Sequence, residues 1–156
     1  QDLRIKQEIM LGIGGYRALR ALGLSPVVYH MNEGHSAFLG LEHIRQLIVQ
    51  EGLTFEQARE ASSAGSIFTT HTPVEAGHDR FSSDLVRLAG GKFESNIGLT
   101  HAELMELGNE HPGKAGNPFC MTALALRFSR AANGVVGTVF KNRSMLAQPI
   151  WLMLKK

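Results

Sequence analysis

The sequence predicts an α/β fold in which a partial Rossmann-like parallel sheet is flanked by helices. Residues 27–29 and 66–70 are short apolar runs rich in β-branched and aromatic side chains, which is typical of buried strands. Between them, apolar residues recur at helical spacing. The order strand, helices, strand is that of a parallel β-α-β crossover. A chain of 156 residues with 44% hydrophobic side chains suffices for one such domain.

The first half of the chain alternates helices and strands. The expected elements are a helix over residues 3–22, a strand over 27–29, helices over 36–50 and 54–63, and a strand over 66–70. The first helix is expected to kink or pack closely at the glycines of residues 12–15, and Gly23 ends it. Thr54 and Gln57 form a capping box that opens the helix over residues 54–63.

The second half contains more loops. The expected elements are a loop over residues 71–81, a polar stretch up to Gly98, a short helix over 100–107, a loop over 109–118 and an apolar helix over 119–132. Thr100 and Glu103 form the capping box of the short helix. Asn133 and Gly134 are expected to end the apolar helix.

Charge and cysteine content exclude several classes of function. Sixteen Lys and Arg against fourteen Asp and Glu leave a formal charge of +2 with no basic block, so we expect no nucleic-acid partner. No apolar run is long enough for a membrane span, and the first residues show no signal-peptide pattern. Cys120 is the single cysteine, so a reducing, cytoplasmic location is expected.

Polar side chains follow both predicted strands. Asn32, Glu33 and His35 come after the first strand, and Thr70 and His71 lie at the end of the second. Ligands of open α/β sheets gather beyond the carboxyl ends of parallel strands, so a shared pocket is expected there. The alternative is structural, because Asn32 or Ser36 can cap the next helix and His35 can be a satisfied interior residue.

Two other motifs support weaker hypotheses. The residues GIGG at 12–15 lack the third glycine of a dinucleotide loop and lie within a helical pattern, which excludes that function. His78 and Asp79 could join His35 and His71 in the metal site of a hydrolase. Neither an HExxH pattern nor a paired short spacing of ligands occurs, so we expect no metal.

Four segments of the sequence resemble successive parts of one enzyme family. They are RIKQEIMLGIGGYRALRALGLSP, VYHMNEGHSAFLGLEHIR, FTTHTPVEAGHDRF and NPFCMTALALRFSRAANGV. They resemble the α-glucan phosphorylases, the family of glycogen, starch and maltodextrin phosphorylases, and most of all its shorter bacterial and archaeal branch. The resemblance runs in order over residues 2–135, which makes it far more specific than any single motif.

The resemblance implies a fold and a reaction. It implies that residues 1–135 are part of the N-terminal domain of a two-domain enzyme of the glycosyltransferase-B type. The family cleaves the terminal α-1,4 bond of a glucan with inorganic phosphate and releases glucose 1-phosphate. The 5′-phosphate of pyridoxal phosphate transfers the proton. An α-1,4-glucan and inorganic phosphate are therefore the expected partners of the intact enzyme, whose oligomeric state the sequence does not fix.

The resemblance also implies roles for the strand-end residues. The family segment like THT supplies a histidine that lines the glucosyl pocket, and this role maps onto His71, with Thr70 beside it. The segment like MNEGH lines the same pocket and maps onto Asn32, Glu33 and His35. Preorganised dipoles and negative groups stabilise an oxocarbenium-like transition state, so His71 is expected to position the sugar rather than act as a general acid.

The sequence departs from the family in two respects. The lysine that carries pyridoxal phosphate belongs to the family's C-terminal domain, so no cofactor-binding residue is expected in this chain. Half a cleft cannot align sugar, phosphate and cofactor, and the fragment is expected to be inactive alone. Residues 136–156 do not follow the family, and a shifted reading frame is our hypothesis for this tail. The alternative function is a stand-alone carbohydrate-binding module without catalysis.

Overall fold

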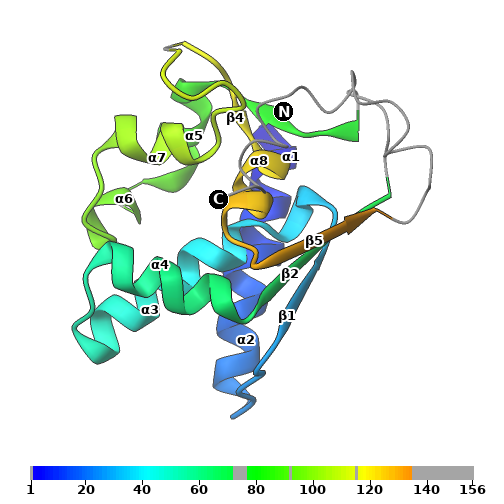
Figure 1. The fold of residues 1–156 in the computed structure, drawn as a ribbon. Coiled ribbons are helices and arrows are strands. Elements are labelled where there is room, and N and C mark those ends of the chain that lie inside the picture. Colours follow the sequence, from blue (N-terminus) through cyan, green and yellow to red (C-terminus); the bar gives the residue numbers. More distant parts are fainter. Residues whose placement is uncertain (1, 72–76, 92, 115, 135–156) are drawn as a thin grey trace.

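The computed structural model describes residues 2–71, 77–91, 93–114 and 116–134, and Figure 1 shows its elements. The helices are α1 (Asp2–Ile9), the π-helix η1 (Met10–Gly14), α2 (Gly15–Ala21), the 3₁₀ helix η2 (Gly34–Ser36), α3 (Phe38–Glu51), α4 (Phe55–Ala64), α5 (Ser83–Gly90), α6 (Phe93–Asn96), α7 (His101–Leu107) and α8 (Met121–Arg127). The strands are β1 (Tyr29–Asn32), β2 (Ser66–Thr70), β3 (Arg80–Phe81), β4 (Phe119–Cys120) and β5 (Ala131–Gly134). The predicted boundary at residue 135 and the tail over 136–156 lie outside the described residues.

Strands β1, β2 and β5 form a parallel sheet with β2 in the middle. Tyr29 pairs with Ser66 and Asn32 pairs with Thr69, so β1 and β2 end at the same edge. Figure 1 shows the sheet with α3 and α4 packed beside each other next to it. The predicted α/β class and its parallel strand pair are confirmed. Strands β3 and β4 form a separate antiparallel pair.

The predicted first helix consists of α1, η1 and α2 in direct succession. The π-helix lies at the glycines where the sequence predicts a kink or close packing. A Cβ atom on Gly12 would lie 2.8 Å from the backbone nitrogen of Leu39 and 2.9 Å from Cβ of Phe38. Because only glycine avoids these contacts, Gly12 allows the π-helix to lie against the start of α3.

The core joins the sheet to the helices around it. Met31 of β1 and Phe68 of β2 are each 1% exposed, and Phe38 and Ile44 of α3 and Leu124 of α8 belong to the same cluster. Burial of a side chain of this size contributes about 2 kcal/mol. This core fixes the ends of β1 and β2, where the candidate site lies.

The position of the first strand differs from the prediction over residues 27–29. The strand is Tyr29–Asn32, in which buried and exposed residues alternate. Val27 and Val28 precede it and are 88% and 51% exposed. The apolar run therefore does not mark the strand. The residues that pair with β2 alternate between buried and exposed, as in a half-buried strand. As a result, Asn32 is the last residue of the strand, whereas the prediction placed it beyond the strand end.

The predicted helix over residues 119–132 is wrong in extent. The segment contains strand β4, helix α8 and the start of strand β5. The segment is buried in both its strand and its helix, with no exposed surface at Phe119, Cys120, Met121 and Leu124. Its sequence is therefore apolar throughout, whatever the secondary structure. Hydrophobic periodicity does not separate buried strand from buried helix in such a run.

Both capping boxes are confirmed, at Thr54 with Gln57 and at Thr100 with Glu103. Helices α5 and α6 lie in the stretch that the sequence analysis treated as polar, and β3 lies in the predicted loop over 71–81. Ser82 caps α5, because its hydroxyl oxygen accepts a hydrogen bond from the Leu85 amide. Among the described residues, no helix is both long enough and apolar enough to span a bilayer.

Candidate functional site

Four of the five predicted site residues meet at the carboxyl ends of β1 and β2. We call Asn32, Glu33, Thr70 and His71 the edge cluster. The Glu33 amide donates a 2.8 Å hydrogen bond to the carbonyl oxygen of Thr69, which extends the parallel pairing beyond Asn32. The side chains at the ends of β1 and β2 therefore lie close together, as expected for neighbouring parallel strands.

Glu33 links the two strands through its carboxylate. Oε2 accepts a 3.2 Å hydrogen bond from the Thr70 hydroxyl, and Oε1 accepts a hydrogen bond from the His71 amide. The side chain is largely buried, with 8% of the residue exposed. Its carboxylate therefore lies beside donors from the end of β2 and the residue that follows it, and such donors stabilise a buried carboxylate.

The backbone of Glu33 is strained. Its φ of 62° and ψ of 178° fall in a region that residues other than glycine rarely adopt. Such a conformation costs about 1–3 kcal/mol and persists only where the surroundings hold it. The hydrogen bonds from Thr70 and His71 help to hold Glu33 there.

His71 is exposed and bonds to the other strand through its ring. Its Nε2 lies 2.6 Å from Oδ1 of Asn32. Because the amide oxygen only accepts, Nε2 is the protonated nitrogen and Nδ1 is the acceptor. The contact with Asn32 thus fixes both the orientation and the tautomer of the imidazole.

A row of hydrogen bonds crosses the sheet one residue before the edge cluster. His30 Nε2 lies 2.6 Å from the Thr69 hydroxyl, and this hydroxyl donates a 2.5 Å hydrogen bond to Oδ1 of Asn133. The ring of His30 therefore has a structural partner within the sheet. Asn133 was missed as a neighbour of the site because the sequence analysis placed it at a helix end and not in β5.

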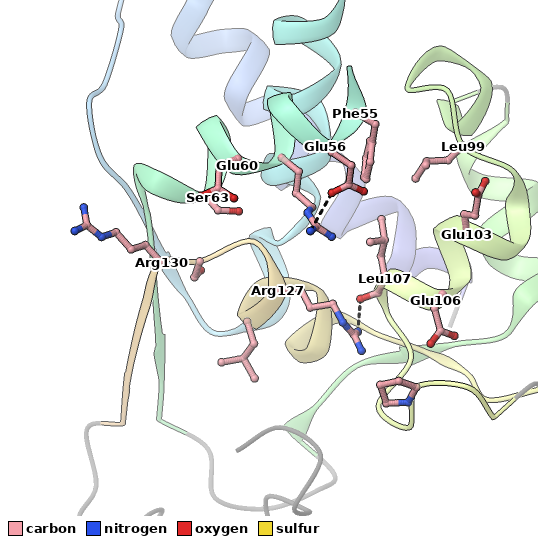
Figure 2. Close-up of a pocket in the computed structure, with 14 residues that line it drawn as sticks. Phe55, Glu56, Glu60, Ser63, Leu99, Glu103, Glu106, Leu107, Arg127 and Arg130 are labelled. Atoms are coloured by element: carbon pink, nitrogen blue, oxygen red, sulfur yellow. Dashed lines mark hydrogen bonds and ion pairs between the residues drawn. The ribbon is translucent and has the colours of Figure 1, made fainter. Parts of the chain in front are cut away.

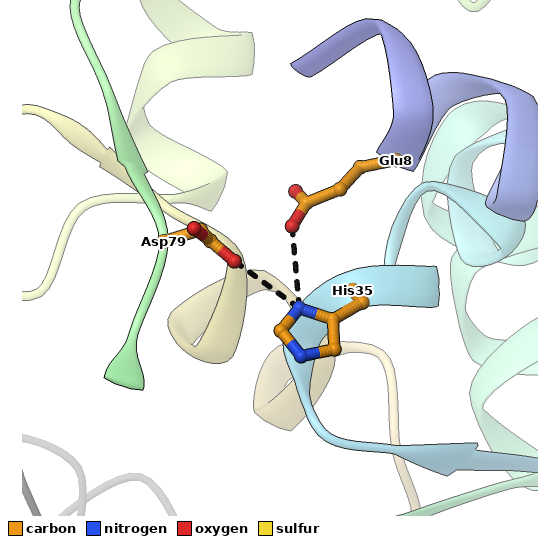
Figure 3. A group of neighbouring side chains, drawn as sticks. All are labelled: Glu8, His35 and Asp79. Carbon is orange, nitrogen blue, oxygen red and sulfur yellow. Dashed lines mark hydrogen bonds and ion pairs between the residues drawn. The ribbon is translucent and has the colours of Figure 1, made fainter. Parts of the chain in front are cut away.

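His35 does not join the edge cluster. It lies with Arg4, Glu8 and Asp79 in a group that we call the ionic cluster (Figure 3). Its Nδ1 is 2.8 Å from an Arg4 guanidinium nitrogen, 3.1 Å from Asp79 Oδ2 and 3.3 Å from Glu8 Oε1. The expectation of one hollow containing Glu33, His35 and His71 is therefore wrong for His35, because the turn of η2 directs Nδ1 toward α1.

The two acids of the ionic cluster have opposite protonation behaviour. Burial, together with the smaller effect of its contact with Asp79, raises the pKa of Glu8 to about 9, so Glu8 is neutral at pH 7. Burial also acts to raise the pKa of Asp79, but hydrogen bonds from Arg4 and Glu8 outweigh it and hold that pKa below its ordinary value. The pair therefore shares one negative charge, which Arg4 balances across 2.9 Å.

The ligand atoms of Glu8, His35 and Asp79 all lie within 4.8 Å of one another, which is close enough to hold a metal ion. The Arg4 guanidinium already lies against His35 and Asp79 as a cation. The four-residue metal site of the hydrolase hypothesis is wrong in geometry. His71 contacts Asn32, and His78 Nδ1 lies 2.8 Å from the Thr122 hydroxyl.

A cleft of about 680 Å³ lies elsewhere, between α4 and α7 (Figure 2). Its walls carry Glu56 and Glu103 as well as Arg127, whose guanidinium donates to the carbonyl oxygen of Leu107. Burial lowers the pKa of Arg127. None of the edge cluster lines this cleft, so the predicted site and this cleft are separate features.

The fold and the strand-end cluster define an α/β protein of the Rossmann-like class with polar groups at the carboxyl edge of a parallel sheet. Comparison with known sequences then identifies the family, although no family model matches the chain. The maltodextrin phosphorylase of Thermococcus litoralis is 44% identical over 150 residues, which cover 96% of this chain and 17% of that protein.

Two further relatives carry related names. The glycogen phosphorylase of Mycobacterium tuberculosis is 43% identical over 147 residues, covering 86% of this chain and 17% of that protein. The glycogen phosphorylase of Aquifex aeolicus is 29% identical over 156 residues, covering 100% of this chain and 22% of that protein. The chain belongs to the α-glucan phosphorylase family, and it spans about a sixth of the length of the first relatives that it matches.

Proposed function

We propose that this chain is the part of an α-glucan phosphorylase that contacts the terminal glucosyl residue. The hydrogen bonds that join Asn32 to His71, and Glu33 to Thr70 and His71, carry this proposal. They form a polar edge on a rigid parallel sheet, where ligands of α/β proteins bind. The reaction proposed for the whole enzyme is the cleavage of terminal α-1,4-glucosidic bonds by inorganic phosphate, which releases glucose 1-phosphate.

His71 is the catalytic residue of this proposal. With Nε2 bonded to Asn32, its Nδ1 can accept a hydrogen bond from a sugar hydroxyl. Its amide is held by Glu33, so the main chain at His71 is fixed as well. A fixed carbonyl dipole near the anomeric carbon stabilises the positive charge that develops in an oxocarbenium-like transition state. His71 therefore positions the sugar and transfers no proton.

Asn32, Glu33, His35 and Thr70 are the proposed substrate-binding residues. Asn32, Glu33 and Thr70 act from the edge cluster. His35 acts differently, because the ionic cluster holds its Nδ1 while Nε2 points away from Glu8 and Asp79 (Figure 3). Nε2 is thus the nitrogen of His35 that is left to reach a sugar.

Pyridoxal 5′-phosphate is the proposed cofactor of the whole enzyme, and the edge cluster does not fit it. The cluster offers amide, carboxylate, hydroxyl and imidazole groups, whereas the cofactor is held through a lysine amine. Neither described lysine belongs to the edge cluster. Lys6 pairs with Asp2 on α1, and Lys114 lies in the loop between α7 and β4. We therefore propose that the cofactor and the phosphate bind to other parts of a phosphorylase-length protein.

A cytoplasmic location fits this function. The single cysteine, Cys120, is buried and has no disulfide partner, and burial raises its pKa to about 11. Such a thiol is unreactive and is compatible with a reducing compartment.

Calorimetric titration with maltotetraose tests the sugar contact directly. We expect binding that His71→Ala weakens about fivefold, because the loss of a hydrogen bond to a polar ligand costs about 1 kcal/mol. His111→Ala, in the loop that precedes β4, serves as the control and is expected to leave binding unchanged. Equal affinities of wild type and His71→Ala would contradict the proposal.

The phosphorolysis assay separates this role from that of a complete enzyme. Purified residues 1–156 are expected to release no glucose 1-phosphate from maltodextrin and phosphate, because catalysis needs sugar, phosphate and cofactor held together. Release by this chain alone would show that the catalytic groups lie within it. The stand-alone binding module is not favoured, since the identities of 43–44% are to phosphorylases.

A further inference from the structure

Three side chains remote from the edge cluster form a hydrogen-bonded chain of hydroxyl, imidazole and carboxylate. The Ser83 hydroxyl lies 2.9 Å from Nε2 of His101, and Nδ1 of His101 lies 2.8 Å from Oε2 of Glu94. Ser83 begins α5, Glu94 lies in α6 and His101 begins α7. The three residues therefore meet through the fold, although they are 7 and 18 positions apart in the chain.

The order of partners fixes the protonation pattern of the imidazole. A carboxylate only accepts hydrogen bonds, so the proton of neutral His101 lies on Nδ1, toward Glu94. Nε2 is then the acceptor for the Ser83 hydroxyl proton. This is the arrangement in which a histidine can act as general base toward a serine while a third group holds the ring.

The environment of Ser83 is open. Ser83 is exposed, whereas the side chain of His101 is 10% exposed and that of Glu94 is 18% exposed. Ser83 and His101 line a cleft of about 610 Å³, together with the basic residues Arg87 and Lys114. The nucleophile is therefore accessible while the groups that orient it are shielded from water.

Hydrogen-bond donors for a developing oxyanion are close to Ser83 along the chain. The first four amides of a helix have no partner within the helix. In α5, the amides of Leu85 and Val86 are taken by the Ser82 hydroxyl and the Ser82 carbonyl. The amides of Ser83 and Asp84 are the other two donors of this first turn, beside the hydroxyl that would attack.

A second serine–histidine pair shows what distinguishes this one. The Ser62 hydroxyl lies 3.1 Å from Nδ1 of His43, but Ser62 is fully buried and the His43 ring stacks on Tyr16. Burial lowers the pKa of His43. The Ser62 pair is packed inside the protein and has no access to a substrate, whereas the Ser83 pair opens into a cleft.

We propose that Ser83, His101 and Glu94 form a second active site, separate from the edge cluster, that hydrolyses small carboxylic esters. Ser83 is the nucleophile, His101 the general base and acid, and Glu94 the positioning residue. Arg87 and Lys114 outnumber the one acidic residue on the cleft wall, Glu106, and favour an ester that carries a negatively charged group. This activity goes beyond the phosphorylase role and does not depend on it.

The reaction balances in two steps. The Ser83 oxygen bonds to the ester carbonyl carbon while its proton moves to His101 Nε2, and the alcohol leaves with that proton as its bond to the carbonyl carbon breaks. Water then attacks the acyl group on Ser83 and gives one proton to His101. The carboxylic acid leaves, and the proton returns to the Ser83 oxygen. The sum is ester plus water to acid plus alcohol, with no oxidant or reductant.

Labelling with a fluorophosphonate, which modifies activated serines, tests the nucleophile. We expect one label per chain, mapped by peptide mass spectrometry to Ser83. Ser83→Ala is expected to abolish it, and His101→Gln to slow it about 100-fold, which is the lower range for the loss of a general base. The matched control is Ser25→Ala, because Ser25 is also exposed but its hydroxyl bonds to Arg20.

Because the label is mapped on the wild-type chain, the test does not depend on any variant folding. Absence of label at Ser83, or labelling spread equally over Ser83 and Ser25, would overturn the proposal. An unchanged labelling rate in a folded His101→Gln variant would do the same.

The role of Glu94 is tested with p-nitrophenyl acetate. If Glu94 acts only by holding His101, Glu94→Gln should lower kcat at least about tenfold and leave KM within about twofold, since orientation of the base matters in the transition state. An unchanged kcat, or a rise in KM without a fall in kcat, would remove Glu94 from the site.

Discussion

The edge cluster and the ionic cluster each contain a histidine beside a buried carboxyl group, yet they are built in different ways. In the edge cluster, Glu33 receives hydrogen bonds from the hydroxyl of Thr70, the last residue of β2, and from the amide of His71, which follows it. In the ionic cluster, Glu8 is 1% exposed and its Oε2 is a buried oxygen that lacks a hydrogen-bond partner among the described residues.

The difference shows that the donors around a carboxyl group, and not burial alone, decide what the group can do. Glu8 lies next to another acid, and burial raises its pKa to about 9. Glu42 is equally buried, but hydrogen bonds from Arg45 and Arg17 outweigh the effect of burial and lower its pKa. Strand ends supply fixed donors, whereas the ionic cluster depends on side chains from distant parts of the chain.

The largest expected effect is that of Glu33→Ala. The substitution removes the acceptor for the Thr70 hydroxyl and the His71 amide and keeps the strained backbone conformation. We expect the free energy of unfolding to fall by about 3 kcal/mol, because hydrogen bonds to a buried charged group contribute about 1.5–3 kcal/mol each. Urea denaturation measures this change.

Glu33→Gly is the matched control for the backbone strain. Glycine adopts the φ of 62° without steric cost, so this variant is expected to be about 1 kcal/mol more stable than Glu33→Ala. If Glu33→Gly is the less stable of the two, the strain at this position has no energetic importance.

The second prediction concerns pH and separates the two clusters. The folded-state pKa of Glu8 is raised from 4.5 to about 9, so the folded chain binds a proton that the unfolded chain releases in this range. Stability is then highest below the unfolded value and falls as pH rises from about 4.5 to about 9. Thermal unfolding should show a melting temperature that is lower at pH 9 than at pH 6.

Glu8→Gln mimics the neutral acid and should remove most of this decline. Glu42→Gln is the comparison, because the pKa of Glu42 is lowered and its contribution is present at neutral pH and lost toward acid. Glu42→Gln should therefore destabilise the chain at pH 6 and at pH 9 alike. A decline that persists unchanged in Glu8→Gln would assign the pH dependence to another group.

The smallest expected effect is that of Thr70→Val, which removes one donor to Glu33 and preserves the shape of the side chain. The free energy of unfolding should fall by about 1 kcal/mol, the usual contribution of one such hydrogen bond. In Glu33→Ala, the same substitution should cost less, since its partner is already absent. Full additivity of the two changes would show that Thr70 and Glu33 do not interact.

The sequence was sufficient to predict the edge cluster because the argument needs only strand direction. Residues 66–70 form β2 as predicted, and β1 runs parallel to it even though it begins two residues later than predicted. An error of this size in a strand boundary leaves Glu33 and His71 at the same edge of the sheet.

The position of His35 could not be predicted in this way. The 3₁₀ helix Gly34–Ser36 turns the chain after Glu33, and the partners Glu8 and Asp79 are 27 and 44 positions away. Nothing in the local pattern signals such contacts. Helix α5 was not predicted for a local reason. It has only eight residues, and the Gly90–Gly91 pair at its end is typical of a loop.

The most direct test of the central claim is the response of histidine imidazole signals in NMR spectra during a maltotetraose titration. The account predicts that the His71 signals shift together with the side-chain amide signals of Asn32, while those of His101 stay in place. His71 and Asn32 signals that do not move at saturating sugar, or that move no more than those of His101, would contradict it.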